Sequence, residues 1–142
     1  MELPDELYGA VVSEGSEYFF TADCPVGVHD HIHICIKKKN KYLLFSTCSS
    51  QIETAFRLAK MKGYDMNTFP VFKKDENNRL NQDLTYVNCN HVVEISESTF
   101  GKLVKDGKIY RMKGVFTACD LQLIANGVKL SREVERRIKD LF

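Results

Sequence analysis

The chain has 142 residues, of which 44% are apolar and 27% charged, and its formal net charge is +1. This balance is typical of one soluble globular domain, and it excludes a general basic excess, so that any nucleic-acid binding must come from a local patch. No apolar run approaches the roughly 18 residues that a membrane helix needs. The five cysteines are never spaced Cys-x-x-Cys, and the acidic N-terminus lacks a signal-peptide core, so we expect a cytoplasmic protein that binds no membrane.

The first half of the chain is expected to form short strands. Two β-rich segments, residues 8–13 and 17–21, precede a loop over residues 24–30 that contains proline and glycine. Residues 31–38 and 42–48 are apolar strands separated by a short polar turn, Lys39-Asn40-Lys41, and this pattern predicts a β-hairpin.

A helix is predicted over residues 51–62, where apolar side chains recur at helical spacing. Ser50 and Glu53 have the spacing of a capping box, and Gly63 is a typical helix end. Further strands are expected over residues 68–73, 84–87, 91–95 and 109–112, and further helices over residues 96–106, 117–126 and 131–141. The order of elements predicts one α+β domain, with a small antiparallel barrel or curled sheet over about residues 8–95 and a helical tail over about residues 96–142.

Three of the four histidines occupy alternate positions at His29, His31 and His33. Because side chains alternate across a strand, the three imidazoles are expected to share one face, and Ile32, Ile34 and Ile36 the other. Imidazole exchanges protons near neutral pH and binds metals, so this cluster is the strongest chemical signal in the sequence. His91 is isolated, and we expect it to be structural.

Two later stretches resemble a known family. Residues 43–52, which end in Ser49-Ser50-Gln51-Ile52, resemble the strand followed by a Thr-Ser-Gln element in the PemK/MazF-like toxins, the endoribonucleases of toxin–antitoxin systems. Residues 83–90 resemble a second strand of that family, and residues 113–142 resemble the helical end of some divergent members. The resemblance implies an SH3-like β-barrel with C-terminal helices that cleaves RNA without a metal or cofactor, forms a homodimer and binds a cognate antitoxin protein.

The resemblance also implies which residues act. His31 stands where the family commonly has an arginine that contributes to RNA cleavage, and Ser49 stands where it has a threonine. We expect His31 and His33 to serve as base and acid, with Ser49 beside a helix N-terminus that attracts phosphate. The residues expected to bind RNA are His29, Lys37, Lys39, Lys41, Ser50 and Gln51.

Other interpretations stay open. The lysines could be a solvated hairpin tip, and Ser50 could be a simple helix cap. The segment from His29 to Cys35 is also similar to the histidine triad of HIT-type nucleotide hydrolases, with Asp30 at a position that is apolar in that motif. Cys24 with the three histidines could hold Zn²⁺. Finally, the histidines could be polar residues on a barrel that only binds a protein partner.

Overall fold

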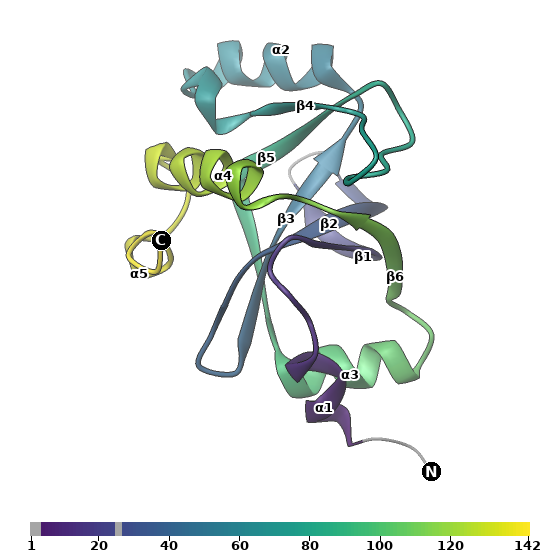
Figure 1. Ribbon diagram of the computed structural model, residues 1–142. Helices are drawn as coiled ribbons and strands as arrows, with labels where there is room; N and C mark the ends of the chain where they lie inside the picture. Colours follow the sequence, from purple (N-terminus) through teal and green to yellow (C-terminus); the bar gives the residue numbers. More distant parts are fainter. Residues whose placement is uncertain (1–3, 25–26) are drawn as a thin grey trace.

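A computed structural model describes residues 4–24 and 27–142, with side chains throughout except those of Glu6, residues 22–24 and residues 27–30. Six antiparallel strands form one sheet that curls into a half-barrel, in the order β4-β5-β3-β2-β1-β6 (Figure 1). The strands are β1 (Ser16–Cys24), β2 (Gly27–Lys39), β3 (Tyr42–Ser49), β4 (Val71–Lys73), β5 (Leu84–Ser96) and β6 (Tyr110–Val115). The helices are α1 (Asp5–Ala10), α2 (Ile52–Lys62), the 3-10 helix η1 (Met66–Thr68), α3 (Glu97–Lys105), α4 (Ala118–Leu130) and α5 (Arg136–Lys139).

The hairpin of β2 and β3 is confirmed. Asn40 and Lys41 have φ angles of 52° and 65°, and two positive φ angles in a two-residue loop are the mark of a type I′ turn, whose twist matches that of the strands. The pairing runs from Lys39 opposite Tyr42 at the turn to His33 opposite Thr47, and a bulge between Cys35 and Lys37 shifts the register by one residue on the way.

Both faces of the sheet are buried by helices. Ile34 and Leu44 belong to a core that includes Ile124 of α4 and Ile138 of α5. Phe45 belongs to a second core, on which Phe100 of α3 stacks. Figure 1 places α1 and α3 together at one end of the molecule and α2 at the opposite end. A strand buried on both faces cannot show the simple alternation of apolar and polar residues that a half-exposed strand shows.

The loop between β4 and β5 joins the two edges of the half-barrel. The Val115 N–H at the end of β6 donates to the carbonyl oxygen of Asn77 in this loop, at 2.8 Å. The Asn78 side chain holds the loop in shape, because its Oδ1 accepts from the N–H groups of Asp75 (3.1 Å) and Leu80 (3.2 Å) while its Nδ2 donates to the Lys73 carbonyl (2.9 Å). The loop is thus a fixed wall that spans from β4 to β6.

The strand expected over residues 8–13 was wrong, since residues 5–10 form α1. A short apolar run does not by itself distinguish a strand from a helix. Tertiary contact decides in favour of the helix here, because α1 and α3 approach closely through glycines. A Cβ on Gly101 would lie within 2 Å of the Asp5 carbonyl oxygen, and one on Gly9 would lie 2.5 Å from the Glu97 backbone.

Several element boundaries also differ from expectation. Residues 84–87 and 91–95 are parts of one strand, β5, and α4 continues past Gly127 to Leu130. The sheet extends beyond residue 95, because β6 pairs with β1 inside the stretch expected to be a helical tail. The Thr117–Asp120 capping box is confirmed at the start of α4. No helix in the described ranges has both the length and the apolar character to cross a bilayer.

A buried polar network ties three elements together. The Asn90 Nδ2 of β5 donates to the Thr68 Oγ1 of η1, and the Ser131 hydroxyl after α4 donates to the Asn90 Oδ1, both at 2.8 Å. Removing one member of a buried network leaves its partners unsatisfied. We therefore expect Asn90→Ala to lower the free energy of unfolding by about 2–3 kcal/mol in urea denaturation.

Asn126→Ala on α4 is the matched control for Asn90→Ala. The Asn126 side chain is exposed and accepts one hydrogen bond from Gln122, at 3.0 Å. Its replacement is expected to change stability little. Equal losses in the two variants would contradict the stabilising role of the buried network.

Candidate functional site

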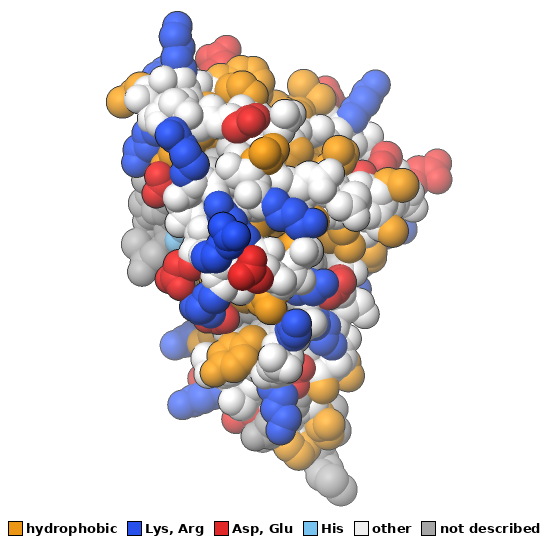
Figure 2. Space-filling view, turned by 90° about the vertical axis from the view of Figure 1, so that its left-hand side faces the viewer, with side chains coloured by type: hydrophobic (Ala, Val, Ile, Leu, Met, Phe, Trp, Pro, Cys, Tyr) orange, Lys and Arg blue, Asp and Glu red, His pale blue; other side chains and the backbone are white. Residues whose placement is uncertain are grey.

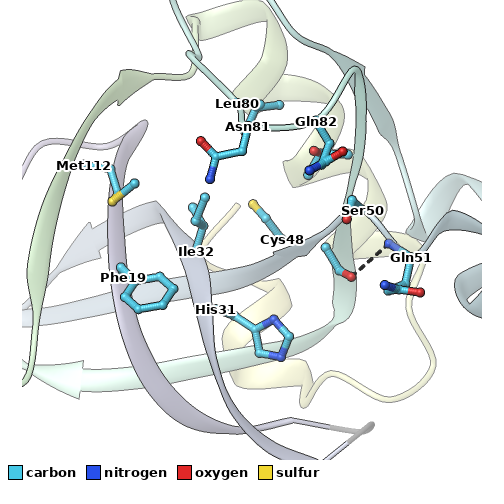
Figure 3. Close-up of a pocket in the computed structure, with 12 residues that line it drawn as sticks. Phe19, His31, Ile32, Cys48, Ser50, Gln51, Leu80, Asn81, Gln82 and Met112 are labelled. Atoms are coloured by element: carbon cyan, nitrogen blue, oxygen red, sulfur yellow. Dashed lines mark hydrogen bonds between the residues drawn. The ribbon is translucent and has the colours of Figure 1, made fainter.

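A cavity of about 530 Å³ opens at one end of the half-barrel. Five strands, β1, β2, β3, β5 and β6, and two connecting segments supply its walls (Figure 3). The residues that line it are Phe19, His31, Ile32, Cys48, Ser49, Ser50, Gln51, Leu80, Asn81, Gln82, Thr85 and Met112. Its size is within the range of pockets that hold a small ligand or one unit of a polymer.

The described lining of this cavity carries no Asp, Glu, Lys or Arg side chain. Its apolar part comes from the strands and includes Phe19, Ile32 and Met112. Its polar part consists of one imidazole, three hydroxyl groups and the side-chain amides of Gln51, Asn81 and Gln82. Such a mixture of apolar surface and a few neutral hydrogen-bonding groups suits a planar ligand group with polar edges.

The register of the hairpin brings His31 and Ser49 to the same pocket. His33 pairs with Thr47, so the residue two positions earlier in β2 approaches the residue two positions later in β3. Both His31 and Ser49 line the cavity. The sequence-based expectation that the imidazole and the Ser49-Ser50-Gln51 turn converge is therefore met for His31.

Ser49, not Ser50, caps the turn before α2. The Gln51 N–H donates to the Ser49 Oγ at 3.1 Å, whereas the Ser50 carbonyl oxygen accepts from the Ile52 N–H at 2.9 Å. Gln51 is the N-cap residue and its side chain makes no capping hydrogen bond. The predicted Ser50–Glu53 capping box is therefore wrong. Because Gln51 also lines the pocket, the positive end of the α2 dipole lies at the pocket wall.

His33 is not among the described residues that line the pocket. Its side chain is fully buried, and its ring stacks on Phe20 with a centroid distance of 3.8 Å. Phe20 is also opposite His31 in the pairing of β1 with β2, so His31 and His33 share one face of β2. At His33, the Phe20 ring covers that face. The Nδ1 of His33 lies 2.9 Å from the His31 carbonyl oxygen, and its Nε2 has no hydrogen-bond partner.

Burial lowers the pKa of His33 to about 4, because the interior disfavours the charged imidazolium. The hydrogen bond to the His31 carbonyl opposes this shift, and the nearby His31 and His91 reinforce it. A neutral, buried imidazole does not donate a proton at neutral pH. We therefore do not include His33 in the proposed site. The side chain of His29 lies outside the described residues.

The hairpin lysines lie away from the pocket. Lys39 ends β2 and Lys41 is in the turn, whereas the pocket is lined by His31 and Ser49 at the other end of β2 and β3. The Lys37 Nζ lies 5.8 Å from the centre of the Phe142 ring, and the Lys38 Nζ donates to the Ala10 carbonyl oxygen. None of the lysines expected to bind RNA lies on the described pocket lining.

A buried carboxyl group lies near the pocket, on β1. Glu17 is 1% exposed, and its Oε2 has no hydrogen-bond partner. Burial raises the pKa of Glu17 to about 7, although Arg111 lowers it, and the negative charge of Asp75 adds to the increase. Burial raises the pKa of the Cys48 thiol, which lines the pocket, and the negative charge of Glu17 adds to this increase. Sequence analysis could not single out this carboxyl group, since a glutamate in a polar stretch is usually exposed.

The pocket residues that sequence analysis missed come from distant parts of the chain. Phe19, Asn81, Gln82 and Met112 reach the pocket only because the β4–β5 loop and β6 close the half-barrel. In the sequence, residues 81–82 were part of a polar excursion between strands. Two adjacent side-chain amides in such a loop are the only sequence feature that could have marked residues 81–82 as binding residues.

Within the described ranges, no group of three or more His, Cys, Asp or Glu side chains is placed to hold a metal ion. The Cys24 and His29 side chains, two of the expected zinc ligands, lie outside the described residues. Comparisons with protein-family models and with curated proteins find no match to this chain. The geometry of the pocket therefore carries the functional argument.

Proposed function

We propose that the protein is a toxin-like endoribonuclease that cleaves RNA without a metal, and that the pocket at the end of the half-barrel is its active site. The observation that carries this proposal is the meeting of His31 from β2 with Ser49, Ser50 and Gln51 before α2 in one cavity. The resemblance to the PemK/MazF-like toxins points to the same residues. It also leads us to expect a homodimer and an antitoxin partner.

His31 is the only histidine on the described lining, and imidazole is the side chain that most often acts as a general base. In the proposed reaction, His31 takes the proton of a ribose 2′-hydroxyl, whose oxygen attacks the adjacent phosphorus. The bond from phosphorus to the 5′-oxygen breaks, the leaving oxygen takes a proton from solvent, His31 returns the proton that it removed to solvent, and a 2′,3′-cyclic phosphate forms. No water is consumed in this step, and no electron acceptor is needed.

In this proposal, Ser49 and the N-terminus of α2 bind the phosphate. Because the Ser49 Oγ accepts from the Gln51 N–H, its own O–H can donate towards the pocket. The N-terminus of the 11-residue helix α2 adds a partial positive charge at the same wall. Gln51, Asn81 and Gln82 offer paired donors and acceptors of the kind that recognise the edges of unpaired bases.

The test is cleavage of a single-stranded RNA in the presence of EDTA, followed by gel electrophoresis. We expect the natural protein to cleave it and to leave 2′,3′-cyclic phosphate ends. His31→Ala is expected to lower the cleavage rate by about 100-fold or more, as for the loss of a general base. His91→Ala is the matched control, since it removes an imidazole that is not on the described pocket lining.

Failure of the natural protein to cleave any RNA would contradict the proposed catalysis. Cleavage that survives His31→Ala would contradict the role of His31. Tight RNA binding without cleavage would instead identify a catalytically inactive relative of these nucleases, in which the pocket keeps only its binding role.

A further inference from the structure

Strand β6 carries a dense group of basic and aromatic side chains. Residues 108–113 read Lys-Ile-Tyr-Arg-Met-Lys, and no acidic residue occurs between Asp106 and Asp120. Lys108, Tyr110, Arg111 and Lys113 are exposed, with 59% of Tyr110 accessible. The exposed ring of Tyr110 therefore lies among cations and is open to stacking by a planar group.

This strand is at the edge of the sheet and next to the pocket. β6 is the last strand in the sheet order, so one of its sides has no neighbouring strand. Tyr110 is opposite Phe19, and Phe19 and Met112 both line the pocket. Figure 3 shows Met112 and Phe19 side by side at one border of the pocket. A polymer that runs along β6 therefore passes the pocket entrance.

The arginines of α5 are paired with carboxylates. Figure 2 shows a face on which Lys and Arg side chains are interleaved with Asp and Glu. At α5, Arg137 binds both carboxylate oxygens of Glu94 at 3.1 Å and also Glu135 at 2.9 Å, and Arg136 pairs with Asp140 at 3.4 Å. Residues 108–113, in contrast, have no acidic residue within their own segment.

We propose that β6 is the track that binds a single-stranded polynucleotide and leads it to the pocket. Cations that follow the phosphate backbone, combined with an exposed aromatic ring on which a base stacks, are the usual means of binding single strands. In this assignment, Lys108 and Lys113 bind phosphates and Tyr110 stacks on a base. The identity of the polymer as RNA rests on the proposed function, whereas the track itself does not require cleavage.

The test is the binding of a labelled, 2′-O-methylated 12-nucleotide RNA, measured by fluorescence anisotropy at several salt concentrations. This oligonucleotide lacks the attacking hydroxyl, so binding is measured without cleavage. Lys108→Glu with Lys113→Glu is expected to weaken binding at least 10-fold and to lower the magnitude of the salt slope by about 1.4, as for two lost phosphate contacts on a single strand. Arg111 is left unchanged, since its guanidinium lies 5.6 Å from the centre of the Tyr18 ring and near the buried Glu17.

Lys39→Glu with Lys41→Glu is the matched control, because it changes the net charge equally at the hairpin tip. Tyr110→Ala is expected to weaken binding about 10-fold through lost stacking. Its control is Tyr42→Ala, another exposed tyrosine, which is expected to have no effect on binding. Circular dichroism verifies that each variant is folded.

The outcomes separate this inference from the proposed function. If the β6 variants bind and cleave RNA as the natural protein does, the proposed role of β6 is contradicted, whereas the proposed nuclease activity is not. Equal loss in the hairpin control would also contradict the role of β6, because only total charge would then matter. Binding that depends on β6 without any cleavage of ordinary RNA would support the track and contradict the nuclease. No binding by the natural protein would overturn both.

Discussion

Gly114→Ala is expected to lower the free energy of unfolding by at least about 3 kcal/mol and to release the pocket wall, because the new methyl group has no space. A Cβ at Gly114 would lie within 2 Å of the Asn78 carbonyl oxygen and 2.1 Å from the Glu17 Oε2. The Asn78 backbone cannot move aside easily, since its side chain is bonded to three backbone groups of the same loop. The β4–β5 loop must therefore separate from β6.

Urea denaturation measures the loss of stability, and amide hydrogen exchange at Val115 measures the separation. The Val115 N–H is bonded to Asn77 and should lose its protection in the variant. Gly107→Ala is the control, because a Cβ there meets nothing within 4 Å, although the φ angle of 72° causes some strain. If Gly114→Ala is no less stable than Gly107→Ala, the steric argument is incorrect.

Glu17→Gln is expected to stabilise the protein at pH 8 and to have little effect near pH 4.5. The Glu17 carboxyl has a pKa of about 7 in the folded protein because burial disfavours its charged form. In the unfolded chain it ionises near 4.5. The folded state of the natural protein thus loses stability as the pH rises from about 4.5 to 7, by an amount on the order of 3 kcal/mol, and loses no more above this range.

Glutamine has the same shape and no charge at any pH. The difference in unfolding free energy between Glu17→Gln and the natural protein should therefore grow with pH between 4.5 and 7 and then stay constant. Urea denaturation at pH 5, 6, 7 and 8 measures it. Glu53→Gln, at an exposed carboxyl on α2, controls for the loss of one negative charge. A difference between Glu17→Gln and the natural protein that does not change with pH would contradict this assignment.

The hairpin and its contribution to the site were predictable because they depend on local rules. A two-residue turn with positive φ angles sets the pairing beside it, and the register beyond the bulge between Cys35 and Lys37 brings His31 towards Ser49. The end of α2 at Gly63, with a φ of 67°, and the capping box of Thr117 follow from equally local chemistry.

The parts that sequence analysis missed depend on contacts between distant segments. Alternation put His33 on the same face as His31, but it gave no indication that a second core covers that face at Phe20 and Phe45. The helix at residues 5–10 exists beside α3, where Gly9 and Gly101 allow close contact. Asn81 and Gln82 enter the site through a loop whose anchor, Asn78, looks like an ordinary polar loop residue in the sequence.

The pairing of β6 with β1 has a kinetic implication. The outer edge of β1 is paired only by β6, which follows it by more than 80 residues in the chain. This part of the sheet therefore depends on contacts between residues that are far apart in the sequence. Such topologies fold slowly, because a long loop must close before the contacts that stabilise it can form. During synthesis from the N-terminus, the pocket border at Met112 is missing until late, so the nascent chain is expected to lack a complete pocket until β6 has left the ribosome.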